Sequence, residues 1–252
     1  MKAFITGISS GVGRELTRQL IHAGHEVFGV ARRADRLAEL QRELGTDRLH
    51  TAVCDVANPA DIACVHDELK RAGFLPDVVV LNAAIERDDV WPTYRHDITR
   101  KTFETNVSGA LAWVSCFLDQ FLQRGSGQFI AVSSIFAFRP NETSISSAAS
   151  KAALAVAFRG FQLRYQHAPV RFSVVYFGPI ATGINPRFAP EPPRGLRALF
   201  IASPRAAARA IVRTMTSRRN RVYFPWFPTA LMRFTWWLPD WLFAALTRPF
   251  RR

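Results

Sequence analysis

The 252-residue sequence predicts a single-domain α/β fold, in which helices cover both faces of a doubly wound parallel sheet. Three observations support this fold class. Short apolar runs alternate with helix-length amphipathic segments along most of the chain. Runs such as Val78–Leu81 are continuously apolar, as strands buried on both faces of a parallel sheet require. A glycine-rich loop joins the first apolar run to the first helical segment, and the chain is long enough for a sizeable core.

The expected strands follow the apolar runs and alternate with the expected helices, so right-handed crossovers would connect parallel strands. Strands are predicted at Ala3–Ile5, Glu26–Val30, Thr51–Val53, Val78–Leu81, Gly127–Val132 and Arg171–Tyr176. Helices are predicted at Gly13–Ala23, Arg33–Leu44, Ala60–Ala72, Thr99–Gln123, around Lys151, and at Arg205–Met215. Ser203 and Pro204 support the last helix, because serine caps a helix and proline suits its first turn.

Charge and cysteine content bear on the protein's surroundings. The formal net charge is +13, and Arg205–Arg252 alone holds ten arginines and one acid, Asp240, or 10 − 1 = +9. Such a stretch attracts polyanions, although an arginine-rich proteome would produce the same bias without a function. Three cysteines without CxxC spacing indicate reduced thiols and a cytoplasmic location. The start of the chain is not patterned as a signal peptide, and no metal site is expected, since the histidines lack ligand spacing.

The loop Thr6–Gly13, with the sequence TGISSGVG, is expected to bind phosphate groups. Its glycines allow a tight turn and a close approach of the backbone to a ligand. The helix that follows would direct free N–H groups and a partial positive charge at the pyrophosphate of a dinucleotide. The strand–loop–helix context separates this loop from a plain glycine-rich turn. The residues expected to contact the cofactor here are Gly7, Ser9, Ser10, Gly11, Val12 and Gly13.

Two arginines follow the second predicted strand, where the adenine ribose of a dinucleotide would lie. A carboxylate at this place would bind the 2′-hydroxyl of NAD, whereas Arg32 and Arg33 suit the 2′-phosphate of NADP. Alternatively, they are two solvated residues that open a helix. Asp35 comes later and is expected on the exposed face of that helix. The sequence therefore favours NADP(H).

Six motifs, in order over about residues 1–185, resemble those of the classical short-chain dehydrogenases/reductases. The matching segments are Thr6–Gly13 (cofactor loop), Cys54–Val56 (adenine contact), Leu81–Ile85 (NNAGI, here LNAAI), Glu104–Val107 (active-site asparagine), Val132–Ser134 (catalytic serine) and Phe177–Thr182 (nicotinamide contact). The resemblance implies a Rossmann-type fold, binding of NADP(H), and oxidation or reduction of alcohols and carbonyls.

The resemblance also assigns roles to individual residues. Asp55 and Val56 would hold the adenine. The groups around the ribose and nicotinamide would be Asn82, Ala83, Ala84, Lys151, Pro179, Ile180 and Thr182. The catalytic group would be Asn106, Ser134, Ser147 and Lys151. Residues 1–185 would form the cofactor-binding and catalytic core, 186–221 a substrate-loop region and helix, and 222–252 an aromatic and basic tail of the same domain. Within the middle part, Asn185–Arg197 is expected to be a loop over the site.

One catalytic residue of the family pattern is replaced. The family's helix motif is YxxxK, but this chain has Ser147 four residues before Lys151. Ser134 precedes Ser147 by 13 residues, the usual spacing of the family's serine and tyrosine, so Ser147 occupies the tyrosine position. An aliphatic hydroxyl is far less acidic than a phenol, whose pKa starts near about 10, and it is shorter. Lys151 could still bind the ribose, Asn106 a water relay and Ser134 the substrate oxygen.

Four interpretations of this replacement are open. In the first, reduction uses another proton donor: a water on Ser147, Ser134, or a nearby residue such as Tyr94, His96 or Tyr176. In the second, the protein catalyses a dehydration, cyclisation or isomerisation in this pocket. In the third, the protein binds NADP or a partner without turnover. In the fourth, the serine is an engineered replacement of a native tyrosine. A Ser/Lys hydrolase is disfavoured, because that arrangement is SxxK with an SDN-like partner motif.

The tail from Tyr223 to Phe250 has ten aromatic residues among arginines. Its longest uncharged run, Val222–Met232, has eleven residues and two prolines, whereas a bilayer span needs about 20 apolar residues. The composition suits an interfacial helix on a membrane, a wall over the substrate pocket, or a subunit contact. The first two imply a lipophilic substrate.

Together these patterns predict an NADP(H)-dependent oxidoreductase that acts on a lipophilic carbonyl or alcohol through a non-standard proton relay. The alternative is a protein of the same fold without redox turnover. The expected partners are a small lipophilic substrate, a membrane surface in peripheral contact with the tail, and further copies of the chain in a dimer or tetramer. Nucleic acid is not expected, because no binding module is recognised.

Overall fold

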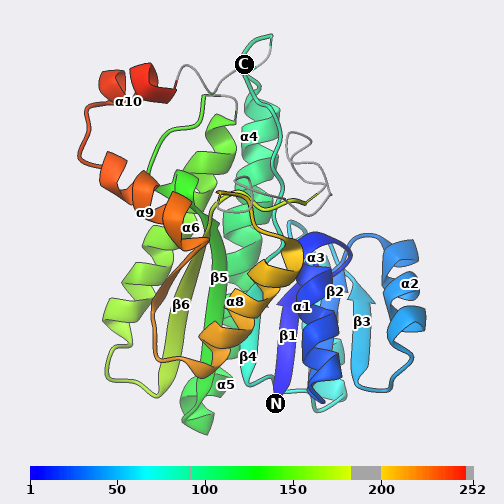
Figure 1. The fold of residues 1–252 in the computed structure, drawn as a ribbon. Coiled ribbons are helices and arrows are strands. Elements are labelled where there is room, and N and C mark those ends of the chain that lie inside the picture. The colour runs from blue at the N-terminus through cyan, green and yellow to red at the C-terminus, as the bar shows by residue number, and fades with distance from the viewer. Residues whose placement is uncertain (91, 143, 183–199, 248–252) are drawn as a thin grey trace.

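The computed structural model describes residues 1–90, 92–142, 144–182 and 200–247. Its centre is a seven-stranded sheet in the order β3-β2-β1-β4-β5-β6-β7, with every strand pair parallel (Figure 1). The strands are β1 (Lys2–Thr6), β2 (Glu26–Ala31), β3 (Leu49–Val53), β4 (Val78–Leu81), β5 (Gly127–Ser134), β6 (Val170–Phe177) and β7 (Arg221–Phe224). The strand order reverses between β1 and β4, which makes the sheet doubly wound, and the predicted fold class is confirmed.

Helices cover both faces of this sheet (Figure 1). They are α1 (Gly11–His22), α2 (Ala34–Leu44), α3 (Pro59–Arg71), α4 (His96–Phe103), a π-helical turn (Glu104–Ser108), α5 (Gly109–Arg124), a 3₁₀ turn (Ile135–Ala137), α6 (Ile145–Arg164), α8 (Pro204–Thr216), α9 (Trp226–Thr235) and α10 (Asp240–Thr247). On one face α1, α2 and α8 enclose an aliphatic core, and on the other α3, α5 and α6 enclose an aromatic one.

The aromatic core explains why α5 lies where it does. Trp113 and Phe117 on α5 are fully buried, and their rings lie 4.4 and 5.3 Å from the ring of Phe4 on β1. Fully burying side chains of this size contributes on the order of 2 kcal/mol each, so these contacts hold α5 against the sheet. The helix predicted at Thr99–Gln123 is therefore present, but it is divided into α4, the π turn and α5.

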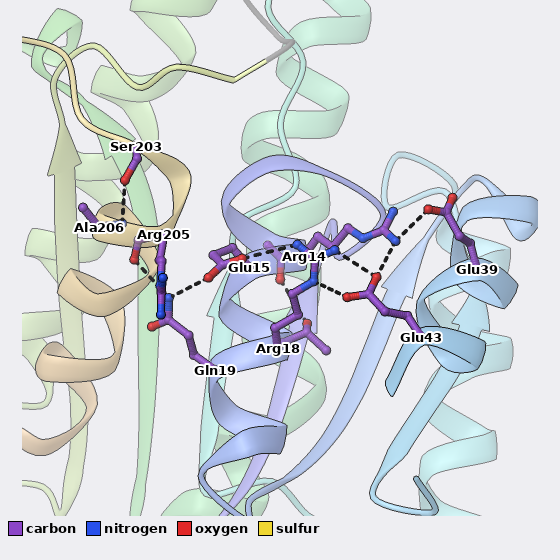
Figure 2. A network of polar contacts seen from close by, with 11 residues as sticks. Arg14, Glu15, Arg18, Gln19, Glu39, Glu43, Ser203, Arg205 and Ala206 are labelled. Atoms are coloured by element: carbon purple, nitrogen blue, oxygen red, sulfur yellow. Dashed lines mark hydrogen bonds and ion pairs between the residues drawn. The ribbon is translucent and has the colours of Figure 1, made fainter. Parts of the chain in front are cut away.

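The polar network of Figure 2 joins α1 to its neighbours. Arg14 reaches Glu39 at 2.8 Å and Glu43 at 2.7 Å on α2, and Arg18 also pairs with Glu43. These hydrogen bonds, chiefly that from Arg18, lower the pKa of Glu43 to about 2. On the other side, Gln19 donates to the backbone carbonyl of Arg205 at 3.0 Å, at the start of α8. Arg14 follows the glycine loop directly but points at α2, so its charge is neutralised there.

The last part of the described chain differs from the predicted tail. β7 was not predicted, yet it pairs with β6 from Val174↔Arg221 to Phe177↔Phe224. α9 and α10 follow it and lie beyond one end of the sheet (Figure 1). The predicted loop Asn185–Arg197 lies outside the described residues. No helix in the described ranges is long and apolar enough to cross a membrane.

Two sets of contacts attach α9 and α10 to the core. The ring of Phe138 lies 4.8 Å from Tyr176, and Tyr176 in turn stacks on Tyr223 of β7 at 5.0 Å. Arg139, which is 7% exposed, donates to Asp240 at 2.7 Å and to the carbonyl of Leu238 at 2.6 Å. The segment after β5 therefore holds the tail against the same end of the sheet.

Candidate functional site

A cavity of about 640 Å³ opens at the carboxyl ends of the strands, on both sides of the point where the strand order reverses. Most of the residues predicted for the site line it. Those on its wall are Gly7, Ser9, Ser10, Gly11, Val12, Arg32, Arg33, Asp55, Val56, Asn82, Ala83, Ala84, Ser134, Ser147, Lys151, Pro179, Ile180 and Thr182. Two predicted residues, Gly13 and Asn106, do not line it.

The glycine loop has a conformation that side chains would disrupt. Gly7 and Gly11 have positive φ angles of 78° and 57°. Gly13 is different, because its constraint is space: a Cβ there would lie 2.3 Å from the carbonyl oxygen of Gly7 and 2.6 Å from Nδ2 of Asn82. Gly13 therefore acts behind the loop, where it allows α1 to pack against the ends of β1 and β4.

Hydrogen bonds tie this loop to β4. The hydroxyl of Thr6 accepts from the backbone N–H groups of Asn82 and Ala83, both at 3.0 Å. The side-chain amide of Asn82 donates to the carbonyls of Thr6 at 3.0 Å and Gly7 at 3.2 Å. Asn82, predicted to contact the ribose or nicotinamide, thus also braces the loop that would contact the phosphates.

The start of α1 has the properties of an anion site. Its N-cap residue, Ser10, makes no side-chain capping bond, and its first turn contains no acid. The N–H groups and the positive end of the helix dipole therefore face the cavity without a carboxylate of their own to neutralise them. This arrangement fits a pyrophosphate group.

Arg33 lies beside the loop and completes the positive surface. Its guanidinium donates to the hydroxyls of Ser9 at 2.9 Å and Ser10 at 2.8 Å. Among the residues that the structure describes, Arg32 forms one ion pair, a long one with Asp55 at 3.8 Å, and both side chains are substantially exposed. Two guanidinium groups next to the end of β2 fit a phosphate on the ribose and would not fit the bare hydroxyl of NAD as specifically.

The predicted catalytic side chains Ser134, Ser147 and Lys151 meet at the other end of the cavity. The Lys151 amine donates to the carbonyl of Val132 at 2.9 Å, and the Ser133 hydroxyl donates to the carbonyl of Lys151 at 2.9 Å. The Ser134 hydroxyl accepts from the N–H of Phe136 at 3.2 Å. Within the described ranges, no hydrogen bond is made by the Ser147 hydroxyl, which leaves it available to a ligand or a water.

Two titratable groups at this end have shifted pKa values. Burial lowers the pKa of the Lys151 amine to about 8, while the negative charge of Glu86 acts in the opposite direction. Burial raises the pKa of the Glu86 carboxyl above its ordinary value, and the positive charge of Lys151 partly offsets that rise. Both groups lie on the cavity wall, and such perturbed pairs in a cleft are typical of functional sites.

Asn106 is buried, and the water relay predicted at this residue stays a prediction. Its amide group is fully engaged by protein: Oδ1 accepts from the N–H of Ile85 at 2.8 Å, and Nδ2 donates to the carbonyl of Ile85 and the hydroxyl of Ser150, both at 3.0 Å. Asn106 is 1% exposed and lies in the π-helical turn. It is a positioning residue for the segment after β4.

The three alternative proton donors considered from the sequence also lie elsewhere. Tyr94 is 53% exposed and His96 is exposed at the start of α4. Tyr176 is buried between Phe138 and Tyr223, and burial raises its pKa. None of the three lines the cavity as the described residues define it.

Several residues on the cavity wall were not predicted as site residues, among them Glu86, Phe136 and Asn141. Glu86 directly follows the segment that resembles NNAGI, Leu81–Ile85. Because that segment was predicted to contact the cofactor, the sequence could have indicated that Glu86 lies near the site. Phe136 and Asn141 come shortly after the strand end that carries Ser134. No pattern in the sequence singles them out, because their placement depends on how the chain turns after β5.

Comparisons with known proteins show the family to which the chain belongs. The family model for short chain dehydrogenases matches residues 1–192. An uncharacterized oxidoreductase of Mycobacterium tuberculosis is 30% identical over 256 residues, which cover 99% of this chain and 96% of that protein. A short-chain dehydrogenase from Streptomyces avermitilis has a TM-score of 0.80 at 24% identity, over 98% of this chain and 95% of that one. One from Burkholderia cenocepacia, in complex with NADP, has a TM-score of 0.80 at 23% identity, over 97% and 96% of the two chains. The chain belongs to the short-chain dehydrogenase/reductase family.

Proposed function

We propose that this protein is an NADP(H)-dependent oxidoreductase that interconverts a lipophilic carbonyl compound and its alcohol. One observation carries the proposal: the uncapped start of α1 and the guanidinium of Arg33 share a cavity with Ser134, Ser147 and Lys151. The first two groups suit the phosphates of NADP, and the others suit the oxygen at a reacting carbon. That a solved relative was found in complex with NADP supports the choice of cofactor.

In this proposal each part of the cavity has a separate task. The N–H groups at the start of α1 bind the pyrophosphate, and Arg33, helped by Arg32, binds the 2′-phosphate. The bound nicotinamide supplies or accepts a hydride at the carbon of the substrate. Lys151 holds the nicotinamide ribose, and the hydroxyls of Ser134 and Ser147 hydrogen-bond to the substrate oxygen. Such hydrogen bonds stabilise the negative charge that develops on that oxygen during reduction.

The substrate end of the cavity favours an apolar ligand. Ile135 and Phe136 line it after β5, and Ile180 lines it after β6. Within the described ranges, no residue of the tail lines the cavity, although Pro225 and Pro228 pack behind Gly178 of its wall. The tail therefore supports the wall from outside and does not act as a lid over the described part of the site.

The proposed function is tested by NADPH oxidation with a panel of aliphatic, terpenoid and aromatic aldehydes and ketones. Wild type should oxidise NADPH with at least one lipophilic member, and Lys151→Met should not. Ser147→Tyr is measured beside them. Activity in that variant alone would mean that the wild-type protein has a reductase pocket but does not catalyse the reduction. Tight NADPH binding with no turnover in wild type would favour the rival function, a binding protein.

We also propose that α9 and α10 rest on an anionic membrane surface. Large aromatic side chains on these helices and between them are mostly exposed: Trp226 (74%), Phe234 (71%), Trp237 (85%) and Trp241 (72%). Indole rings of this kind favour the boundary between lipid and water. The only acid of the final 48 residues, Asp240, is paired with Arg139, and basic sequence lies on both sides of the segment that carries these rings. An anionic lipid surface complements both properties, and it would bring a lipophilic substrate to the cavity.

This contact is tested by sedimentation with vesicles of phosphatidylcholine alone or with one part in three of phosphatidylglycerol. Wild type should sediment with the anionic vesicles and less with the neutral ones, and Trp237→Ala with Trp241→Ala should abolish the difference. Leu163→Ala, an exposed apolar residue on α6, is the matched control and should bind as wild type does. Absence of sedimentation, or a dimer that dissociates in the double variant, would overturn the proposal.

A further inference from the structure

Glu86 is the acidic side chain at the catalytic end of the cavity, and the family resemblance gives it no role. It lies on the wall shared by Ser134, Ser147 and Lys151. The other acid on the wall, Asp55, follows β3 at the cofactor end and pairs with Arg32. The inference drawn from Glu86 rests on the proposed function.

The backbone on each side of Glu86 is fixed by hydrogen bonds. Before it, Asn106 holds both the N–H and the carbonyl of Ile85. After it, the hydroxyl of Ser144 donates to the carbonyl of Arg87 at 2.9 Å. Two residues further on, the buried carboxylate of Asp89 accepts from the N–H groups of Ile145 at 2.9 Å and Ser146 at 2.7 Å.

These bonds join the segment around Glu86 to the start of α6, the helix that carries Ser147 and Lys151. The bond from Asn106 to Ser150 reaches the same helix one turn later. Glu86 is therefore held in a defined place relative to Ser147 and Lys151. The π-helical turn contributes to this framework, because it carries Asn106, whose amide bonds to both Ile85 and α6.

The surroundings of Glu86 favour the protonated carboxyl more than water does. The group is largely buried, and within the described ranges it forms no ion pair and no hydrogen bond with a protein group. Burial raises its pKa, and Lys151 on α6 is the charged group that acts against the rise. A carboxylic acid with a raised pKa is a suitable general acid near neutral pH, whereas a serine hydroxyl is not.

We propose that Glu86 is the acid that delivers the proton to the substrate oxygen, in the place left by the missing tyrosine. During reduction the carbonyl carbon receives the hydride, and the electron pair of the C=O π bond forms an O–H bond with the proton of Glu86. The products are the alcohol, the oxidised cofactor and the Glu86 carboxylate, which is reprotonated by water entering the cavity. In the oxidation direction the carboxylate accepts the proton from the alcohol.

The test compares wild type with Glu86→Gln, which has nearly the same shape but no acidic proton. Glu68→Gln, an exposed substitution on α3, is the matched control. NADPH affinity should be unchanged in both variants. The kcat of Glu86→Gln should fall by about 100-fold, the contribution usual for a general acid, while Glu68→Gln keeps wild-type activity. Wild-type kcat/KM should fall as the pH rises through the pKa of Glu86, and that limb should be missing in Glu86→Gln. Glu86→Asp should recover part of the activity and the limb.

A second readout needs no substrate and separates this inference from the proposed function. Carbon-13 labelled glutamate is incorporated, and the carboxyl signal absent from Glu86→Gln is titrated by NMR in wild type. A pKa clearly above that of an exposed glutamate is expected. An ordinary pKa overturns the inference whether or not a substrate has been found, as does a Glu86→Gln variant with wild-type kcat and an unchanged pH profile. A wild type that binds NADPH but reduces no carbonyl overturns both proposals.

Discussion

At the cofactor end of the cavity the side chains of the loop are bonded to their neighbours, whereas at the catalytic end two polar side chains, Ser147 and Glu86, remain available. Thr6, Gly7 and Asn82 form a closed set of hydrogen bonds, and Arg33 is bonded to Ser9 and Ser10. By contrast, the hydroxyl of Ser147 and the carboxyl of Glu86 have no hydrogen bond to a described protein group. A rigid frame can therefore bind the cofactor while the groups that transfer protons change independently of it.

The largest expected effect is a loss of NADPH affinity caused by a substitution in the glycine loop at the cofactor end. Gly13→Ala would place a methyl group 2.3 Å from the carbonyl of Gly7 and 2.6 Å from the amide of Asn82. Because neither atom can move without disturbing the loop, NADPH affinity should fall by about 100-fold or more, as for other overpacked sites that lose several kcal/mol. Fluorescence titration of NADPH measures this.

Gly160→Ala is the control for that variant. Gly160 is exposed on α6, and a Cβ there meets nothing within 4 Å. It should leave NADPH affinity intact and stabilise the protein by about 0.5–1 kcal/mol, because alanine suits a helix better than glycine. Normal NADPH binding by Gly13→Ala would show that the loop is not the constrained part of the site.

A smaller effect is expected when Arg33, which lies beside the loop at the cofactor end, is replaced. Arg33→Ala should weaken NADPH binding by about 10- to 100-fold, the value of one or two charge-assisted hydrogen bonds, and leave NADH binding little changed. Arg36→Ala is the control, since Arg36 pairs with Glu39 on the exposed side of α2. Equal losses for both cofactors would mean that Arg33 holds the loop and does not read the 2′-phosphate.

At the catalytic end, Lys151→Met should stabilise the fold at neutral pH while abolishing activity. Burial lowers the pKa of Lys151 to about 8, so protonation of the buried amine opposes folding. This cost is absent above the pKa of lysine in the unfolded chain, and it grows to its full size as the pH falls through about 8. The variant should therefore be more stable than wild type by about 2 kcal/mol below pH 8, and the difference should vanish toward about pH 10.5. Urea unfolding at a series of pH values measures it. A variant less stable than wild type at neutral pH would contradict the assigned burial.

The smallest effect lies outside the cavity, in the network of Figure 2. Glu43→Gln should cost about 0.5–1 kcal/mol at neutral pH, because its ion pairs are partly exposed. The pKa of Glu43 is lowered to about 2, so the wild-type advantage is present above the unfolded value and lost as the pH falls toward about 2. Thermal unfolding at neutral and acidic pH checks the sign, and NADPH affinity should not change.

The cofactor end could be predicted from the sequence because its signals are local. A strand, a glycine loop and a helix follow one another in the chain, and the arginines come directly after the next strand. The sheet could be predicted for the same reason, since its central strands are continuously apolar. β7 was missed because Arg221–Phe224 is short and runs into prolines, and its place is set by pairing with β6.

The catalytic end could be predicted only in part. Ser134, Ser147 and Lys151 follow from motif spacing, and they lie on the cavity wall. The role of Asn106 depends on long-range partners, Ile85 and Ser150, that no local pattern reveals. The position of Glu86 depends in turn on these hydrogen bonds of Asn106 and on the bond from Ser144 to the carbonyl of Arg87.

The most direct test of the account follows the hydride itself. Wild type is incubated with NADPH that carries deuterium on one or the other face of the nicotinamide C4, together with the lipophilic carbonyls of the panel, and the alcohols are analysed by mass spectrometry. We expect one deuterium in the product from one of the two labelled cofactors, despite the serine at position 147. Tight binding of NADPH without transfer of deuterium to any carbonyl would contradict it.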